Sequence, residues 1–513
     1  MATRIFGAID VGSYELNLSI YEFDQDSMKV IDSIKYRLDL GTDSYSKGRL
    51  PADKIEELCR ILREFNRIMK GYHVSDYRAY GTSAIRETRN TRILLDQIEQ
   101  RTGIHVDVLS NAEQRFMDYK SVASKGNDFI RTIDNPTAIV DIGGGSIQMS
   151  LFDKDKLVVT QNMKLGVLRL QERLNELDAT PAKYDDLLEE IIEAQIGVFK
   201  KLYLEDRRIE NLIIVDDYVS PITWARTKDS KNPGMVSAER FMAFFDRIRE
   251  MNPVEFCRRY SVAMENLQLV YIAAKLINST LKMMGTENIW APGVSLNDGI
   301  AYEYGERKKL IVIDHDFEED IIACARNISR RYMGDDKRGK TLEKICLTIF
   351  DSMKKITGLS KRDRLLLRMA AILHDCGKYI SLYNLAQSSY DIVKATEIIG
   401  LSDSEREIVA GVVKYNHTYL DYDIDSVNSE HEDDDIYMRI AKLSAILRIA
   451  NGLDKSQKQK FNDIKASLKD DVLTITVRTN KDITLEKGMF LRRADFFQEI
   501  FCVKPVIKQI SKV

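Results

Sequence analysis

Two short stretches of the chain place an aspartate, at least one glycine and a serine between apolar runs. The first reads "AIDVGSYELNLS" over residues 8–19, and the second reads "AIVDIGGGSIQMS" over residues 138–150. Glycine lacks a β-carbon and permits positive φ, so successive backbone N–H groups of such a turn can converge on a phosphate oxygen. The serine adds a hydroxyl donor. Each stretch therefore predicts a phosphate-binding turn.

Asp10 and Asp141 precede the glycines of the two turns. A carboxylate repels phosphate, but it can hold a divalent cation, or the waters of that cation, that bridges to the phosphate oxygens. We therefore predict that these two aspartates anchor Mg²⁺. Tight hairpins with aspartate caps are the structural alternative for either turn alone, and the repetition favours the phosphate interpretation. The predicted phosphate donors of the turns are Gly12, Ser13, Gly143, Gly144, Gly145 and Ser146.

The elements that must position these turns form an α/β pattern. Strand periodicity covers residues 3–9, 15–23 and 28–38, and a helix at about 51–69 follows, opened by Pro51. Strands and helices then alternate up to the second turn, as in an α/β layer. Because the second turn repeats the first, we predict two duplicated half-domains, each contributing one turn to a shared cleft.

Composition limits the classes of partner. The chain has 513 residues, 44% of them hydrophobic, which predicts three or four domains. The net charge of −3 gives no overall attraction to duplex nucleic acid or to a membrane, so an anion site must be local. The six cysteines show no C-x-x-C spacing, which argues against zinc and disulfides and predicts a reducing cytoplasm. No apolar run approaches the roughly 20 residues of a membrane helix.

Several ordered motifs make residues 4–305 similar to the exopolyphosphatase and guanosine pentaphosphate phosphohydrolase family of the actin and hexokinase superfold. The motifs are "DVGS" (10–13), "GTSAIRE" (81–87), "SNAEQR" (110–115), "DIGGGS" (141–146) and "KLGVLRLQE" (164–172). The resemblance implies a Mg²⁺-dependent hydrolase that releases the terminal phosphate of inorganic polyphosphate or guanosine pentaphosphate. It also implies a cytoplasmic homodimer.

The resemblance assigns roles to side chains between the two turns. Glu113 is expected to activate the attacking water, since Ala112 replaces its usual acidic neighbour. Such a general base contributes roughly 10²–10⁴-fold to the rate. Arg86 is expected to bind two phosphate oxygens with its planar guanidinium group, beside hydroxyl donors from Thr82 and Ser83. The structural alternatives are a first-turn helix residue for Glu113, a solvated charge for Arg86 and a helix cap for the hydroxyls.

The chain departs from the family pattern at three places. Tyr14 and Glu15 replace Asn-Ser, Asp216 and Asp217 replace Gly-Gly, and Asn297 and Asp298 replace part of Arg-Glu-Gly. These departures weaken the inference of full activity and leave the fold prediction unchanged. A sensor that binds polyphosphate or guanosine tetra- and pentaphosphate without turnover is therefore the second hypothesis. A sugar or acetate kinase is a distant third, because the sequence shows no adenosine pocket and no base for a phosphoryl acceptor.

The last third resembles the helical HD-type domain that long members of the family append. Its main feature is "RLLLRMAAILHDCGKYIS" (364–381), which contains His374 and Asp375. An intact HD metal site also needs a preceding His and a distal Asp, and Arg338 and Asn451 stand there instead. We therefore predict that His374, Asp375 and His417 are a structural remnant, in a domain that acts as a cover or platform.

The predicted fold class is α/β, with two duplicated actin/hexokinase-like (ribonuclease-H-like) domains, a mostly helical HD-like domain and a small α/β tail. The predicted bounds are 1–125, 126–307, 311–456 and 457–513. An acidic run at 421–435 is expected to be a solvated loop.

Overall fold

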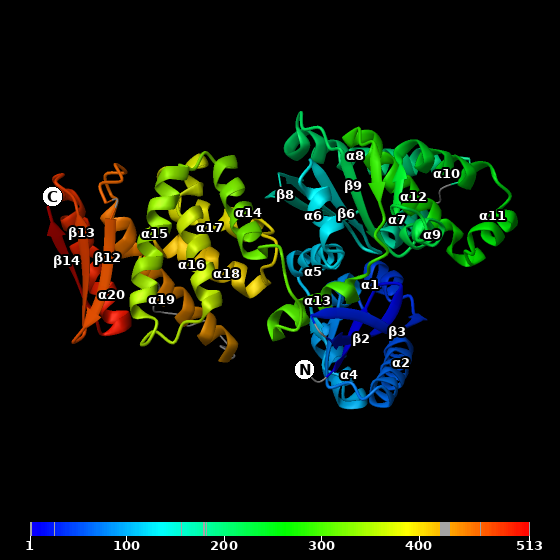
Figure 1. Ribbon diagram of the computed structural model, residues 1–513, viewed down its shortest axis with the longest axis horizontal. Helices are drawn as coiled ribbons and strands as arrows, with labels where there is room; N and C mark the ends of the chain where they lie inside the picture. Colours follow the sequence, from blue (N-terminus) through cyan, green and yellow to red (C-terminus); the bar gives the residue numbers. More distant parts are fainter. Residues whose placement is uncertain are drawn as a thin grey trace. The chain divides into compact units, whose positions relative to one another are not determined.

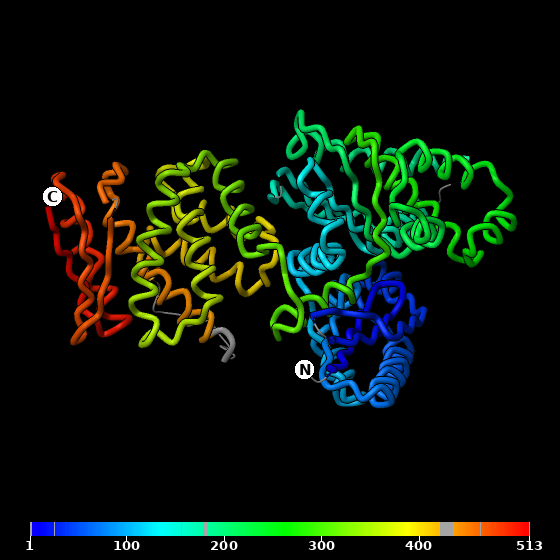
Figure 2. Tube along the Cα trace, in the orientation of Figure 1, coloured from blue at the N-terminus to red at the C-terminus, as the bar shows by residue number. Residues whose placement is uncertain are grey.

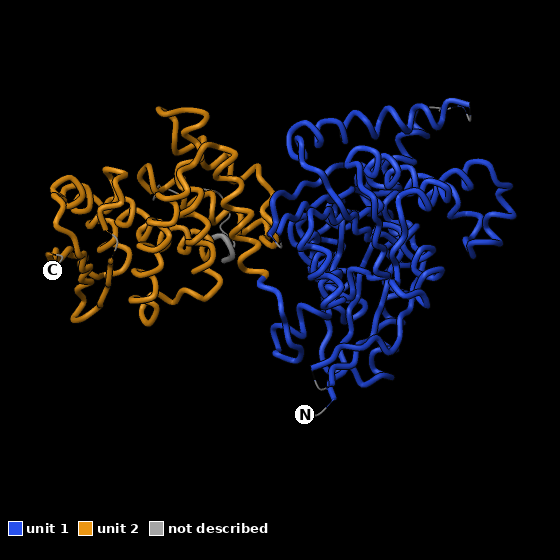
Figure 3. Tube along the Cα trace, turned by 45° about the horizontal axis from the view of Figure 1, so that its top comes forward, with its two compact units in different colours: residues 1–316 blue, residues 317–513 orange. Residues whose placement is uncertain are grey.

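The computed structural model describes residues 3–24, 26–154, 156–177, 180, 182–420, 431–461 and 463–511. The chain divides into two compact units, Met1–Asp316 and Phe317–Val513 (Figure 3). Residues 421–430 of the acidic run lie outside the described residues, so the prediction of a solvated loop there stays a prediction. Within the described residues, no helix is long and apolar enough to cross a membrane.

The first sheet of unit 1 has five strands in the order β3-β2-β1-β4-β5. β2 pairs antiparallel with β1 and β3, whereas β4 runs parallel to β1 and β5 runs parallel to β4. The strands are β1 (Arg4–Val11), β2 (Glu15–Asp24), β3 (Ser27–Arg37), β4 (Asp76–Gly81) and β5 (Asp107–Val108). The first predicted phosphate turn joins β1 to β2.

The second sheet repeats this arrangement in the order β10-β11-β9-β6-β7-β8. β7 pairs antiparallel with β6 and β8, and β9 and β11 run parallel to β6, as β4 and β5 do beside β1. The strands are β6 (Thr137–Ile142), β7 (Ile147–Asp153), β8 (Lys156–Met163), β9 (Asn211–Asp216), β10 (Met235–Ser237) and β11 (Asn288–Trp290). The predicted duplication is therefore present in strand order and direction, with β10 as an added edge strand.

Helices cover both sheets (Figure 1). α2 (Ala52–Gly71) starts after Pro51, as predicted, and buries apolar residues at three- and four-residue spacing against the first sheet. α7 (Val167–Glu176), α8 (Tyr184–Phe199) and α12 (Leu267–Met284) share one core with the second sheet. The other helical segments here are α1 (Gly41–Lys47), α3 (Ser83–Glu87), α4 (Thr91–Thr102), α6 (Asn127–Ile133), η1 (Lys200–Leu204), α9 (Ser220–Thr227), α10 (Ala238–Glu250), α11 (Pro253–Tyr260) and η2 (Met264–Asn266).

Two helices from distant parts of the sequence pack together between the sheets: α5 (Asn111–Ala123) and α13 (Leu296–Lys308). Figure 2 shows the chain returning to the first sheet at α13, after it has completed the second. The sequence-based bounds assign residues 296–307 to the second half-domain, but α13 packs on β1, β2 and β3. A β-carbon on Gly299 would lie 1.9 Å from the Met117 carbonyl oxygen, so this close helix contact requires glycine.

Unit 2 is mostly helical and ends in a three-stranded sheet, β12-β13-β14. Its helices are α14 (Phe317–Arg331), α15 (Asp336–Met353), α16 (Lys361–Leu373), η3 (Cys376–Tyr379), α17 (Leu385–Ala395), α18 (Asp403–Tyr415), α19 (His431–Leu453) and α20 (Thr484–Phe501). Its strands are β12 (Asp463–Lys469), β13 (Val472–Arg478) and β14 (Lys504–Ile510). The helical domain and the small α/β tail are both present.

Candidate active site

The two turns close in the same way at the ends of β1 and β6. The Gly12 N–H donates to the Glu15 carbonyl oxygen at 3.2 Å, and the Gly143 N–H donates to the Ser146 carbonyl oxygen at 3.0 Å. A β-carbon on Gly12 would lie 2.6 Å from the Glu15 oxygen, so this turn requires glycine. The duplication of the two half-domains therefore includes the hydrogen bond that closes each turn, and these two N–H groups are used within the turns.

A cleft of about 110 Å³ lies where the two turns meet. Most of the residues predicted from the sequence line it: Asp10, Gly12, Ser13, Thr82, Ser83, Asp141, Gly143, Gly144 and Ser146. The two halves of the duplicated fold therefore bring their turns to one site. Glu113, Arg86 and Gly145 are not among the lining residues.

Three hydroxyl groups, from the first turn, α1 and α3, form a cluster beside the cleft. Ser13 Oγ lies 2.7 Å from the Tyr45 hydroxyl and 2.9 Å from Ser83 Oγ, and the Tyr45 hydroxyl lies 2.5 Å from Ser83 Oγ. A β-carbon on Gly145 would lie 2.4 Å from the Tyr45 hydroxyl, which explains why Gly145 faces this cluster and not the cleft. The Arg169 guanidinium carbon lies 4.3 Å from the centre of the Tyr45 ring, and Arg169 Nε donates to the Gly145 carbonyl at 2.8 Å.

The cleft is acidic. Its carboxylates are Asp10, Glu15, Asp118, Asp141, Asp216 and Asp217, and no lysine or arginine is among the described residues that line it. Burial raises the pKa of Asp141 to about 7. Burial, together with the nearby Asp141 charge, raises the pKa of Asp118 well above its ordinary value. Burial also raises the pKa of Asp10, with a further contribution from Asp217. Clustered negative charge of this kind favours a proton or a metal cation.

Four buried oxygen atoms around the cleft accept no hydrogen bond from the part of the chain that the structure describes. They are Asp10 Oδ1, Gln114 Oε1, Asp118 Oδ2 and Gln148 Oε1. Oxygen ligands are the ones that Mg²⁺ prefers, and it usually takes one or two carboxylates and completes its shell with water and phosphate oxygens. Among the described residues no three carboxylate, thiol or imidazole groups form a metal site by themselves. The donor set therefore fits a cation that is shared with a phosphate substrate.

The first departures from the family pattern, Tyr14 and Glu15, have partners away from the turn. The Tyr14 hydroxyl donates to Asn266 Oδ1 at 2.6 Å, and the Arg37 guanidinium carbon lies 4.7 Å from the centre of its ring. Lys35 Nζ lies 2.5 Å from the Glu15 carboxylate and 3.3 Å from that of Asp217. Lys35 therefore compensates part of the charge at the mouth of the cleft.

Comparison with known proteins decides the family. A model described as "Ppx/GppA phosphatase family" matches residues 19–308, and one described as "Ppx/GppA phosphatase, domain III" matches residues 322–497. The chain belongs to the Ppx/GppA phosphatase family. Curated relatives named guanosine-5'-triphosphate,3'-diphosphate pyrophosphatase are 19% identical: one from Vibrio atlanticus over 424 residues and one from Aeromonas hydrophila over 420. Each match covers 80% of both chains.

Solved structures confirm the predicted fold class. The Ppx/GppA family member of Aquifex aeolicus superimposes with a TM-score of 0.50 at 18% identity, covering 61% of this chain and all of that one. An exopolyphosphatase-like protein superimposes with a TM-score of 0.51 at 22% identity, covering 60% of this chain and all of that one. The two mixed sheets of unit 1 therefore form the actin-like Ppx/GppA core, and unit 2 contains domain III.

The structure places Glu113 at the start of α5, where its side chain closes a capping box with Ser110. Its Oε2 accepts from the Ser110 N–H at 3.0 Å, and the Glu113 N–H donates to Ser110 Oγ at 3.2 Å. The carboxylate therefore stabilises the N-terminal end of α5, as in the structural alternative, and its role as the base stays a prediction. The next residue, Gln114, lines the cleft of this Ppx/GppA chain, followed one turn later by Asp118.

Arg86 also lies outside the cleft lining. Its Nη1 donates to the Leu109 carbonyl at 2.6 Å, which ties α3 to the segment before α5. The neighbouring hydroxyl residues Thr82 and Ser83 do reach the cleft. Arg86 therefore has a structural contact here, and the expected guanidinium clamp on phosphate stays a prediction.

The other departures have structural roles. Asp216 accepts from the Tyr218 N–H at 2.7 Å and the Ser220 N–H at 2.9 Å, which caps α9. Asn297 Nδ2 donates to the Asn17 carbonyl at 3.1 Å, so it fixes α13 on β2. Asp298 closes a capping box at the start of α13.

In domain III, a guanidinium group stands among the HD-like residues. Arg338 Nη1 donates to Asp375 Oδ2 at 2.8 Å, and Nη2 donates to Asn451 Oδ1 at 3.0 Å. His374 Nδ1 donates to the Ala371 carbonyl at 2.9 Å, and His417 Nε2 donates to the His374 carbonyl at 2.6 Å. Asp375 therefore pairs with a cationic side chain, in keeping with the predicted structural remnant.

Sequence reasoning missed Asp118, Gln114 and Tyr45. The first two are four residues apart on α5, so they share a helix face, and this spacing was the available signal. Tyr45 lies on the short helix α1 and carries no motif that would have identified it.

Proposed function

We propose that the protein hydrolyses the terminal phosphoanhydride bond of inorganic polyphosphate or guanosine pentaphosphate with Mg²⁺. The observation that carries this proposal is the meeting of Asp10 and Asp141, from two duplicated turns, in one buried acidic cleft. Family membership supports the reaction class, and the names of the curated relatives support the guanosine substrate. The likeness to the family also supports a cytoplasmic homodimer.

Each group of cleft residues has a distinct part in this proposal. Asp10 and Asp141 would hold the cation, which neutralises phosphate oxygens when bound. The hydroxyls of Ser13, Thr82 and Ser146 can donate to the oxygens of the terminal phosphate. These donors hold the phosphorus in place for attack by water.

Asp118 is the carboxylate best placed to take the proton of the attacking water. It is 4% exposed, it lines the cleft, and its Oδ2 accepts no hydrogen bond from the described residues. Burial and the neighbouring Asp141 charge raise the pKa of Asp118, so this carboxyl must lose its own proton before it can act as the base. Glu113 has no part in this scheme, because its carboxylate closes the capping box of α5.

Binding without turnover is the second candidate function, and Gln114 favours it. An amide is not a base at neutral pH, and it is Gln114, not the preceding motif residue Glu113, that lines the cleft. The hydroxyl cluster of Tyr45, Ser13 and Ser83 also satisfies donors that would otherwise be available to phosphate. A protein of this kind would bind the Mg²⁺ complex of the substrate and keep it intact.

The test measures phosphate release from long-chain polyphosphate and guanosine pentaphosphate, with Mg²⁺ and with EDTA. We expect Mg²⁺-dependent release by the wild type, a loss of at least about 100-fold in Asp118→Asn, and a gain in Gln114→Glu. Gln100→Glu, on the exposed surface of α4, is the matched control for added charge. Saturable binding by a wild type that releases no phosphate would overturn the hydrolase and establish the binding function.

A further inference from the structure

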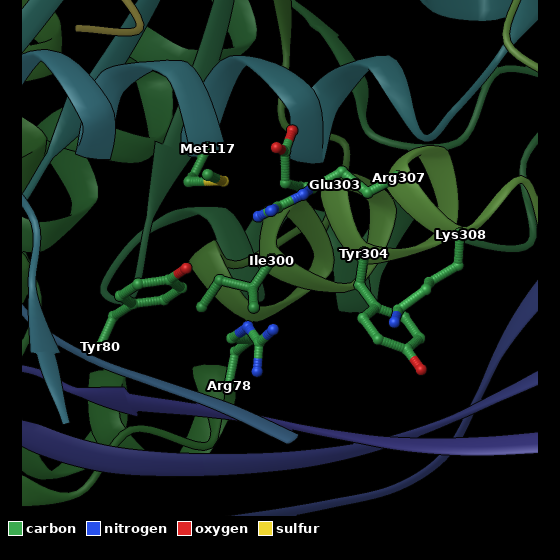
Figure 4. A pocket seen from close by; sticks show the side chains of 8 residues that line it. All are labelled: Arg78, Tyr80, Met117, Ile300, Glu303, Tyr304, Arg307 and Lys308. Atoms are coloured by element: carbon green, nitrogen blue, oxygen red, sulfur yellow. The ribbon is translucent and has the colours of Figure 1, made fainter. Parts of the chain in front are cut away.

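Unit 1 has a second cavity, which is lined by residues of α5 and α13 (Figure 4). These residues differ from the residues of the same two helices that line the acidic cleft. Its volume is about 190 Å³, and its lining residues are Arg78, Tyr80, Met117, Ile300, Glu303, Tyr304, Arg307 and Lys308. None of these residues lines the acidic cleft. The cavity is therefore a separate site with its own chemistry.

Three cationic side chains surround this cavity. In the view of Figure 4, the guanidinium groups of Arg78 and Arg307 end on opposite sides of Ile300, and the Tyr80 hydroxyl points toward them. Lys308 lies at the Tyr304 side, with its Nζ 5.9 Å from the centre of that ring. Arg307 makes no ion pair or hydrogen bond with any described residue, and its side chain is exposed. Its donors are therefore available to a ligand.

Arg78 also keeps donors for a ligand. One of its nitrogen atoms, Nη1, donates to the Tyr77 carbonyl at 3.0 Å, and the same atom lies 3.5 Å from the Asp76 carboxylate. That separation exceeds the usual length of a charge-assisted hydrogen bond, so Asp76 compensates the guanidinium only in part. The planar guanidinium group presents further N–H donors in a fixed fork.

The one carboxylate in the cavity lining, Glu303, is compensated in part by a cation outside the lining. It pairs with Lys120 of α5, which also contacts Glu306 on the next turn of α13. The Lys120 side chain is 3% exposed, whereas those of Glu303 and Glu306 are 24% and 34% exposed, so solvent screens this pairing only in part. Positive charge therefore remains on the cavity from Arg78, Arg307 and Lys308.

We propose that this cavity binds an inorganic oxyanion of phosphate to pyrophosphate size. Two guanidinium groups and an ammonium group match the charge and the multiple oxygens of such an anion. The cavity volume of about 190 Å³ has room for an anion of this size. The Tyr80 hydroxyl adds a neutral donor.

The cavity and the cleft differ in whether they need a metal ion to bind an anion. The cleft is lined by carboxylates and requires a cation before it can take a phosphate, whereas this cavity offers protein cations and takes the free anion. The two sites share α5, because Met117 borders the cavity while Gln114 and Asp118 border the cleft. This proposal does not depend on hydrolysis in the cleft.

The test is calorimetric titration of the full chain with pyrophosphate in EDTA. We expect one saturable site in the wild type, which weakens at higher salt because the charges are partly exposed. The Arg78→Gln and Arg307→Gln double variant should lose at least about tenfold in affinity. Asp141→Asn, in the cleft, should bind as the wild type does.

Lys309→Gln is the matched control, since Lys309 is an exposed cation next to Lys308 that does not line the cavity. It should change the affinity less than twofold. Arg307→Gln alone removes an exposed side chain, so its effect can be measured even if the double variant does not fold. Absence of saturable binding to the wild type, or equal binding to wild type and Arg307→Gln, would overturn the proposal.

Discussion

The Tyr45 hydroxyl lies 2.5 Å from Ser83 Oγ, at the point where the two phosphate turns of unit 1 meet. Ser13 Oγ belongs to the same cluster, so hydroxyls from the first turn, from α3 and from α1 form hydrogen bonds with one another. This part of the site is held together in the absence of substrate, and a phosphate that reaches Ser13 or Ser83 must compete with Tyr45.

Tyr45→Phe tests this competition. Removal of the hydroxyl frees Ser13 and Ser83 to donate to phosphate, so we expect a several-fold lower KM or Kd for the Mg²⁺ complex of the substrate. The free energy of unfolding should fall by about 1 kcal/mol, because one hydrogen-bond partner is lost from the buried cluster. Tyr72→Phe, which removes a hydroxyl that bonds Asp32 at the surface, is the matched control. A weaker affinity in Tyr45→Phe would contradict the competition.

Glu113→Ala should act on stability and not on turnover. Loss of the capping box at the start of α5 should lower the free energy of unfolding by about 1 kcal/mol, and Ser110→Ala should have a similar effect. Urea unfolding measures this change, and initial rates of phosphate release at saturating substrate measure turnover. If turnover fell by about 100-fold or more while unfolding stayed unchanged, Glu113 would be the general base.

Arg338→Ala tests the ion pair of domain III. Arg338 is 6% exposed and Asp375 is 11% exposed, so the variant leaves a poorly solvated carboxylate with Lys378, 2.5 Å away, as a remaining cationic partner. We expect a loss of about 2 kcal/mol in the free energy of unfolding of unit 2, less than for a buried charge with no partner. The exposed pair of Arg330 with Asp336 supplies the control: Arg330→Ala should cost less than about 1 kcal/mol. Equal losses would mean that the buried pair contributes no more than a surface pair.

The lowered pKa of His417 predicts how the stability of unit 2 depends on pH. Burial lowers the pKa of His417 to about 4, whereas an unfolded histidine titrates near 6.5. Between these pH values the unfolded chain binds the extra proton, so stability should fall as the pH drops from about 6.5 to about 4. Urea unfolding of His417→Gln should show a shallower pH dependence over this interval. His105→Gln, on the exposed surface of unit 1, should leave the dependence of unit 2 unchanged.

The predictable part of the site is the part that lies on the repeated strands. Asp10 and Asp141 each end an apolar strand before a glycine turn, so their meeting follows from the duplication of the sheet. The position of Glu113 does not follow from a motif in the same way, because neighbouring residues on a helix point about 100° apart. The sequence contains the capping-box pattern of Ser110 and Glu113. This box holds Glu113 at the start of α5, and the next residue, Gln114, reaches the cleft.

The remaining features depend on contacts that no local pattern contains. The return of α13 to the first sheet brings Gly299 against Met117, across most of the length of unit 1. The proposed oxyanion cavity is lined by Arg78 from β4 and by Arg307 and Lys308 from the end of α13. These residues are distant in sequence, and each alone is typical of a solvated surface charge.

The late position of α13 in the sequence also has a consequence for synthesis. One face of the first sheet buries Phe6, Ala8 and Tyr21 against Ile300 and Tyr304 of that helix. This apolar face is made long before α13 and receives its cover only when that helix has been translated. The nascent first half therefore exposes apolar surface during most of the synthesis of unit 1, which is the interval in which a chaperone would bind it.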